Sequence, residues 1–265
     1  MYRNIFHHLL PKKNKGPLGN VNSFIIYYHA IEQTILTKLT AYDLIILEPR
    51  QISKTQVHEL RQAKPEQPFL FGYVSIMQTP HWNEMRRNSV KKNDYFLEHG
   101  APRFFPQWGS YLMDLRSENY RKILIEEIHQ QIASKHLSGI FLDTVDDIDH
   151  SVMEHNVRQE MGLAYKEFLT EMIRTFPNLL LIQNRGFDQL DEVGSFLHGI
   201  LWEDWNGKQI ADEWVIYQLT RMKNLQKQGI QIFCVSEENR PIHKKTARSL
   251  GFIHLVASSG YNTLD

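Results

Sequence analysis

Eight short apolar runs recur along this 265-residue chain, and they constrain its fold more than any other feature. The runs are continuous rather than alternating and are rich in β-branched and aromatic residues. This pattern is typical of strands that are buried on both faces of a parallel sheet. In chain order the runs are FIIYY (24–28), LIILE (44–48), FLFGYVS (69–75), GIFLD (139–143), LLLIQN (179–184), GILWED (199–204), IQIFCVS (230–236) and FIHLVAS (252–258).

Several of the intervening segments predict helices, because apolar residues recur at helical spacing and cap or breaker residues bound the segments. Strands that alternate with helices over about 250 residues predict a single-domain α/β fold, the (β/α)8 TIM barrel. The alternative is an open doubly wound sheet, which needs a glycine-rich phosphate loop that YYHAIEQT, at the end of the first run, does not contain. The helical segments are 117–136, 158–176, 211–228 and 241–250.

Domain boundaries follow from the same pattern. Residues 1–21 predict a solvated N-terminal tail, and residues 22–265 predict the barrel. A long segment at about 76–116 interrupts the alternation between the third and fourth strands. Loops of this length are usually functional or partly structured, so we expect a lid or rim that carries Trp108 and Asp114.

Composition excludes several classes of partner. The 30 basic and 30 acidic side chains balance, so charge predicts neither a nucleic-acid partner nor a membrane surface. No apolar stretch reaches the roughly 20 residues of a membrane span. Cys234 is the only cysteine, which excludes an intrachain disulfide. The N-terminal stretch lacks the apolar core of a signal peptide, so the sequence as it stands predicts a cytoplasmic protein, or an extracellular one if a leader has been removed.

The fourth run ends in a cluster of carboxylates, GIFLDTVDDID, at residues 139–149. Three interpretations compete: a solvated turn, a metal site, or one half of a catalytic acid pair. Asp143 is the strongest candidate, because it directly follows four buried-type residues at the end of a barrel strand, where barrels hold their chemistry. Of its companions, we expect only Asp146 to contribute. The spacing does not match a calcium loop, so no metal and no cofactor are predicted.

Glu203 is the second candidate acid. Apolar neighbours raise the pKa of a carboxyl group, as a general acid near neutral pH requires. The fourth and sixth strands belong to the same alternate set, with roughly 10 Å between their backbones. Their carboxyl groups therefore reach the ~5–9 Å separation of glycosidic acid pairs. Glu48, on the second strand of the same set, is a possible third acid.

Aromatic and amide side chains accompany these acids at the strand ends. Flat aromatic surfaces stack on sugars, and amides bind hydroxyl or N-acetyl groups. Cys234 lies inside a strand, and neither a G-x-S-x-G elbow nor a P-loop is present, so nucleophilic alternatives are weak. The expected substrate-binding residues are Tyr28, Tyr73, Trp108, Trp202 and Trp205 for stacking, and Gln183 and Asn184 for hydrogen bonding.

Several stretches resemble a known family. MDLRS followed by a helix and then GIFLDTVDD is the most specific combination, and IIYYH, YDLIILEP, GYVS, LLLIQNRGF and GILWEDWN accompany it. Over about residues 22–258 the chain resembles glycoside hydrolase family 114, the endo-α-1,4-polygalactosaminidases, and the related hydrolase domain of the Pel exopolysaccharide system. The resemblance implies a barrel that cleaves α-1,4 bonds in galactosamine-rich polysaccharides. It implies Asp143 as nucleophile or base and Glu203 as general acid/base, with retention favoured.

The chain departs from that pattern at two places. His29 stands where a small residue is common, and Met77–Gln78 stands where Gly-Glu is common, which removes a charge from the rim. Two other functions therefore remain open. One is a catalytically inactive barrel that binds an exopolysaccharide or a biosynthetic partner. The other is a metal-assisted hydrolase, which requires three or more carboxylates of residues 143–149 to converge.

Overall fold

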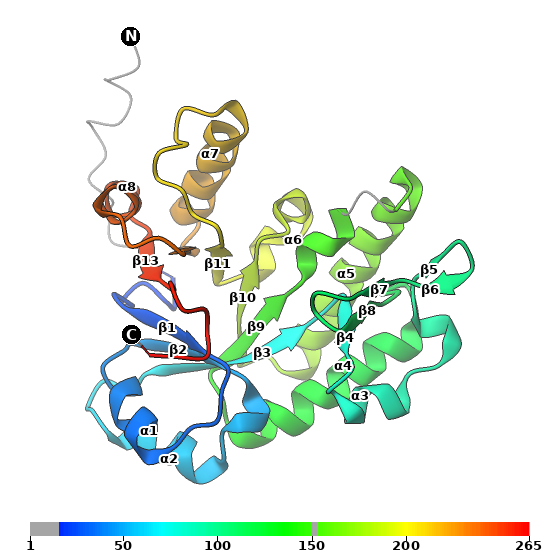
Figure 1. Cartoon of the computed structure of the whole chain (residues 1–265), viewed down its shortest axis with the longest axis horizontal. Coiled ribbons are helices and arrows are strands. Elements are labelled where there is room, and N and C mark those ends of the chain that lie inside the picture. The colour runs from blue at the N-terminus through cyan, green and yellow to red at the C-terminus, as the bar shows by residue number, and fades with distance from the viewer. Residues whose placement is uncertain (1–15, 150–152, 265) are drawn as a thin grey trace.

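Eight parallel strands form one sheet that curls into a nearly closed barrel surrounded by helices (Figure 1). The structure is a computed structural model that describes residues 16–149 and 153–264. The predicted parallel sheet and barrel are confirmed. The strands, in their order around the sheet, are β1 (Phe24–Tyr27), β2 (Leu44–Leu47), β3 (Phe69–Ser75), β9 (Gly139–Asp143), β10 (Leu180–Asn184), β11 (Gly199–Trp202), β12 (Gln231–Ser236) and β13 (Ile253–Val256).

The helices pack around the sheet and begin where the sequence supplies caps. The Ser117 side chain accepts a hydrogen bond from the Tyr120 amide at the start of α4, and Pro241 opens α8. The helices are α1 (Gln33–Leu39), α2 (Lys54–Gln62), α3 (Glu84–Ser89), α4 (Glu118–Gln131), α5 (His155–Thr175), α6 (Leu190–Val193), α7 (Glu213–Lys227) and α8 (Pro241–Ser249). Short 3-10 turns are η1 (Pro49–Gln51), η2 (Lys92–Asp94), η3 (Ala133–Lys135), η4 (Val145–Asp149), η5 (Phe187–Gln189) and η6 (Gly194–Phe196).

Alternation along each strand decides which side chains fill the barrel. Phe71, Phe141, Ile182 and Leu201 belong to the interior cluster, whereas their chain neighbours pack toward the helices. The side chains two positions further on, at the carboxyl ends of β3, β9, β10 and just past β11, therefore share the interior face. They are Tyr73, Asp143, Asn184 and Glu203.

The packed barrel begins before residue 22, where the sequence placed its boundary. Leu18 is fully buried and Val21 nearly so, and both pack in the interior cluster with Phe24. Leu18 and Val21 thus belong to the core. Residues 1–15 of the predicted tail lie outside the described residues.

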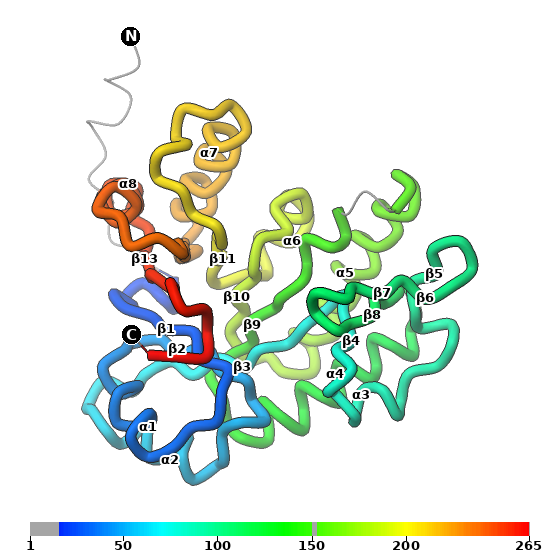
Figure 2. The backbone as a smooth tube through the Cα atoms, in the orientation of Figure 1, coloured from blue at the N-terminus to red at the C-terminus, as the bar shows by residue number. Residues whose placement is uncertain are grey.

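The seam between the first and last strands is closed by the C-terminal segment. Within the described ranges, no ladder of strand hydrogen bonds pairs β1 with β13. Instead, the Tyr28 amide donates to the Tyr261 carbonyl at 2.8 Å. The red C-terminal tube accordingly lies beside β1 and β2 in Figure 2.

The long insertion after β3 is structured. It contains α3, a three-stranded sheet and a two-stranded hairpin (Figure 1). Arg86 anchors the insertion, because its buried guanidinium donates to the carbonyls of Ser75 and Gln78 and to the Glu127 carboxylate on α4. The strands of the insertion are β4 (Gln78–Pro80), β8 (Ser110–Leu112) and β7 (Phe104–Phe105), with the hairpin β5 (Leu97–Glu98) and β6 (Ala101–Pro102).

In the part of the chain that the structure describes, none of the helices combines the length and apolar character that crossing a bilayer requires.

Candidate active site

One amide joins the two candidate acids at the mouth of the barrel. The Asn184 Nδ2 group donates to Asp143 Oδ1 at 2.7 Å and to Glu203 Oε2 at 2.8 Å. Because both oxygens share one nitrogen, they lie no more than about 5.5 Å apart, a limit that is compatible with the ~5–5.5 Å separation of retaining glycosidase pairs. The reverse orientation of the amide would place its oxygen against both carboxylates. Three strand ends thus bring two acids and one bridging donor together.

A tyrosine hydroxyl completes the hydrogen bonding of each carboxylate. Tyr73 bonds to Asp143, and the Tyr261 hydroxyl donates to Glu203 Oε1 at 2.5 Å. Tyr28 lies between these two tyrosines, with ring centroids 4.9 Å from Tyr73 and 5.5 Å from Tyr261. Each carboxylate therefore accepts one hydrogen bond from Asn184 and one from a tyrosine. The rings of Tyr73, Tyr28 and Tyr261 form a continuous row from β3 to the C-terminal segment.

A residue with a left-handed backbone conformation directly follows each of Asp143, Asn184 and Glu203. Thr144, Arg185 and Asp204 have φ values of 62°, 48° and 54°. A β-branched residue such as Thr144 rarely adopts this conformation, and backbone strain of this kind concentrates at functional sites. Thr144 is held there by its hydroxyl, which contacts Ser75 Oγ at 3.0 Å and accepts from the Met77 amide at 2.9 Å. In each case the chain turns directly after the candidate side chain.

The surroundings of the two acids favour one proton between them. Burial raises the pKa of Asp143, although the bonds from Asn184 and Tyr73 oppose this effect. Burial also raises the pKa of Glu203, and the charge of Asp143 raises it further. Ionised Asp143 therefore favours a protonated Glu203, the division of labour that a nucleophile and a general acid require.

Asp146 and Asp204 lie at the rim on either side of Arg185. The Arg185 Nε atom lies 3.3 Å from Asp146 Oδ2, and its Nη1 lies 3.2 Å from Asp204 Oδ2. Glu203 contributes to the raised pKa of Asp146, after burial and against the opposing charge of Arg185. The expected companion Asp146 thus faces the mouth.

Gln78, where the sequence departs from the family pattern, holds a second carboxyl group of the same loop. Its Nε2 donates to Asp147 Oδ2 at 2.6 Å, and its Oε1 accepts from the Ser110 hydroxyl. Burial raises the pKa of Asp147 to about 7 despite this bond. The neutral amide links the insertion to the loop after β9 without placing a second carboxylate beside Asp147.

We expect Asp147→Asn to stabilise the protein more at pH 8 than at pH 5. A carboxyl group whose folded pKa is raised to about 7 favours the folded state at low pH, and that contribution is lost as pH rises through 7. The variant should gain on the order of 1–2 kcal/mol between the two pH values, measured by urea unfolding. Asp191→Asn, at an exposed carboxylate on α6, is the control. An equal effect of Asp147→Asn at both pH values would contradict the prediction.

Glu48 lies in a different network, and the structure does not bring it to Asp143 and Glu203. The side chain caps η1 and pairs with Arg50 Nη1 at 2.9 Å, and Arg50 also contacts Glu127 on α4. Strand alternation would place Glu48 on the interior face, two residues after Ile46. The chain leaves β2 at Leu47, however, and turns into η1, which redirects the carboxylate.

The two predicted tryptophan platforms, Trp202 at the end of β11 and Trp205 just after it, are buried at 6% and 2% exposure. Trp202 packs edge-on against Trp205 and Phe187, and Trp205 Nε1 donates to the His243 carbonyl at 3.1 Å. These rings form an aromatic cluster toward the helices rather than an open stacking surface.

The remaining predicted residues differ in their placement. Gln183 is fully buried on the helix side, where it accepts from the Tyr165 hydroxyl and donates to the Arg185 carbonyl. Asp114 is paired with Arg116 at 2.7 Å. Trp108, in the insertion, is 68% exposed and remains available for stacking.

Tyr261, Arg185 and Asp147 were not identified as functional residues from the sequence. Arg185 directly follows Asn184 in LLLIQNRGF, and this position after a strand end could have identified it as a candidate site residue. Tyr261 lies beyond the last apolar run, and only the return of the chain across the seam brings it to Glu203.

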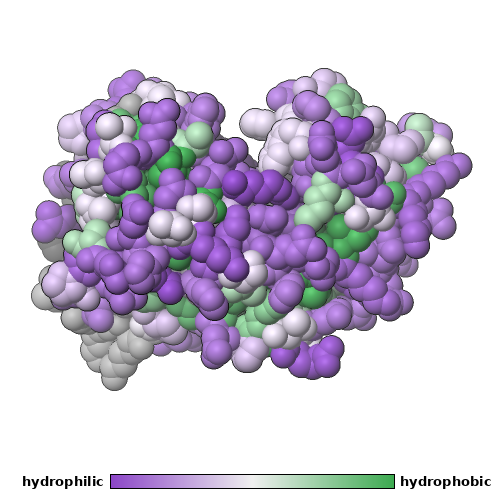
Figure 3. Space-filling model, turned by 90° about the horizontal axis from the view of Figure 1, so that it is seen from below, coloured by the Kyte–Doolittle hydropathy of each residue, from purple (hydrophilic) through white to green (hydrophobic). Residues whose placement is uncertain are grey.

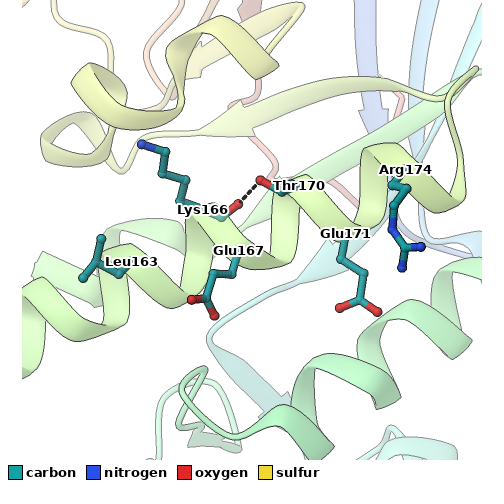
Figure 4. A pocket seen from close by; sticks show the side chains of 6 residues that line it. All are labelled: Leu163, Lys166, Glu167, Thr170, Glu171 and Arg174. Atoms are coloured by element: carbon teal, nitrogen blue, oxygen red, sulfur yellow. Dashed lines mark hydrogen bonds between the residues drawn. The ribbon is translucent and has the colours of Figure 1, made fainter.

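One surface concavity lies away from the strand ends. A shallow groove of about 530 Å³ runs along the outer face of α5, lined by side chains that include Lys166, Glu171 and Arg174 (Figure 4). It contains none of the strand-end residues. Figure 3 shows a mainly hydrophilic face that is notched between two lobes. Within residues 16–149 and 153–264, no group of three or more His, Cys, Asp or Glu side chains is arranged to hold a metal ion.

Two carboxyl groups at the C-terminal mouth of a barrel are an arrangement that glycosidases use. The sequence model of glycoside-hydrolase family GH114 matches residues 24–235. The chain therefore belongs to family GH114 and is a glycosidase.

Solved structures show the same fold. The glycoside hydrolase domain of PelA from Pseudomonas aeruginosa is 20% identical, with 92% of this chain and 97% of that chain covered at a TM-score of 0.76. Ega3 from Aspergillus fumigatus, solved in complex with galactosamine, is 14% identical, with 97% and 96% covered at a TM-score of 0.66. No curated protein matches the chain.

Proposed function

We propose that this glycosidase cleaves α-1,4 bonds within a polysaccharide rich in galactosamine and N-acetylgalactosamine. Membership of family GH114 supports hydrolysis of a glycosidic bond, and the fold shared with PelA and with galactosamine-bound Ega3 supports an amino-sugar polymer. The observation that carries the proposal is the pair of carboxylates that share the Asn184 amide.

In the proposed mechanism, Asp143 is the nucleophile and Glu203 the general acid/base. Asp143 attacks the anomeric carbon while the bond to the leaving oxygen breaks, and Glu203 gives its proton to that oxygen. Water then attacks the same carbon, Glu203 takes the proton from the water, and Asp143 is released. The short separation of the two carboxyl oxygens supports this double displacement, which retains the α configuration.

The acidic rim supports a positively charged substrate. Asp146 and Asp204 lie near the two acids, and Arg185 neutralises only part of their charge. An unacetylated galactosamine carries an ammonium group, which such a rim attracts. We therefore expect partly deacetylated polymer to be hydrolysed faster than fully acetylated polymer.

Incubation with partly deacetylated α-1,4-linked galactosamine polymer, followed by mass spectrometry of the products, tests the proposal. The expected result is a ladder of short oligosaccharides that heat-denatured protein does not produce. Measurable binding of the polymer without products would instead favour the catalytically inactive barrel.

A further inference from the structure

We propose that Tyr261 is a positioning residue for the acid/base step, and that the C-terminal segment which closes the barrel seam delivers it to Glu203. The inference rests on the proposed function, because it assigns Glu203 the acid/base role. The family model matches residues 24–235, and the inference extends the proposed function to a segment that lies after this range.

The contacts of Tyr261 connect the seam to the acid. Its carbonyl accepts from the Tyr28 amide at 2.8 Å, directly after β1. Its ring packs edge-on against Tyr28, with centroids 5.5 Å apart, and its hydroxyl donates to Glu203 Oε1 at 2.5 Å. One residue therefore replaces the missing β1–β13 pairing and fixes the carboxylate at the same time.

A phenol suits both states that Glu203 passes through. When Glu203 is ionised, the Tyr261 hydroxyl donates to Oε1, as the structure shows. When Glu203 is protonated on that oxygen, the phenol oxygen accepts instead, because a hydroxyl group both donates and accepts. The Asn184 amide, in contrast, only donates to Oε2. Tyr261 thus holds the same oxygen in place before and after proton transfer.

The hydrogen bond from Tyr261 lowers the pKa of Glu203, but other groups around Glu203 oppose this effect. Burial and the charges of Asp143 and Asp204 raise the pKa of Glu203, whereas the bonds from Asn184 and Tyr261 lower it. Loss of the tyrosine hydroxyl therefore raises that pKa further. The titratable groups coupled electrostatically to Glu203 are Asp143, Asp146, Asp204, Tyr28 and Tyr261.

Tyr261→Phe tests the inference, because it removes the hydroxyl and keeps the ring against Tyr28. We expect kcat to fall about tenfold with KM within about twofold, and the alkaline limb of the pH–rate profile to move up by about one pH unit. Tyr217→Phe, an exposed tyrosine on α7, is the matched control and should change neither quantity.

A second measurement does not depend on hydrolysis. In protein labelled with ¹³C at the glutamate carboxyl carbons, the Glu203 signal, assigned by its loss in Glu203→Gln, should titrate about one pH unit higher in Tyr261→Phe. Both shifts together support the inference. An unchanged titration would overturn it, and a uniform fall in rate would then mark Tyr261 as structural only. If the Glu203 titration shifts but the wild type releases no products, the contact between Tyr261 and Glu203 is supported and the proposed function is rejected.

Discussion

Asp143→Asn and Glu203→Gln should each lower kcat/KM on the galactosamine polymer by a factor of about 10³. A positioned acid or base contributes about 10²–10⁴ to the rate, and the loss of a nucleophile removes the covalent route altogether. Both replacements keep the size of the side chain. The Asn184 amide can still donate to the remaining carbonyl oxygen, so the fold should persist.

The matched control for these variants is Asp191→Asn. Asp191 carries the same charge as the two acids, but it lies on α6, where its exposed carboxylate pairs with Arg221 at 2.8 Å. We expect its effect on kcat/KM to stay within about threefold, because an exposed surface ion pair contributes little. Full activity in either Asp143→Asn or Glu203→Gln would show that the mouth pair does not perform the chemistry.

The largest effect on stability should come from Arg86→Met. Arg86 is 1% exposed, and its guanidinium donates to the Glu127 carboxylate at 2.6 Å and to the Ser75 carbonyl at 2.7 Å. Removing one partner of a buried ion pair costs about 3–5 kcal/mol, because the other charge is left incompletely paired. For a chain of this size that loss corresponds to a fall in Tm of about 10 °C, measured by calorimetry.

Arg87→Met is the control for this variant, since Arg87 lies on the same helix, is exposed, and donates to the His81 carbonyl. It should change Tm by no more than about 2 °C. Equal Tm values for Arg86→Met and Arg87→Met would contradict the anchoring role of Arg86.

The position of the candidate acids could be predicted because it follows from strand periodicity. Asp143 continues the interior face of Phe141, and Glu203 continues that of Leu201, so two residues of each apolar run determine the direction of the acid. The same rule explains why Trp202 faces the helices, next to Glu203 but on the opposite side of the strand.

Periodicity fails where the chain leaves the strand. Glu48 has the interior parity of Ile46, but η1 begins directly after it and its carboxylate turns to Arg50. Gln183 precedes Asn184 by one position and therefore packs against Tyr165 on the helix side. A list of strand-end residues does not distinguish these cases, because the first turn of each loop decides them.

Contacts across the seam could not be predicted from any local pattern. Tyr261 reaches Glu203 because the segment after β13 crosses to Tyr28, a path that depends on the whole barrel. The bond between Gln78 and Asp147 likewise joins an insertion to a loop 69 residues away. Contacts between segments this far apart in the sequence can be identified only in the three-dimensional structure.

The proposed double displacement requires two carboxylates that lie close together, and the configuration of the first product tests it most directly. Proton NMR during early hydrolysis of the galactosamine polymer by the wild type should show the α anomer first, before mutarotation. The β anomer as first product would mean that water attacks directly, and it would contradict Asp143 as a nucleophile paired with Glu203.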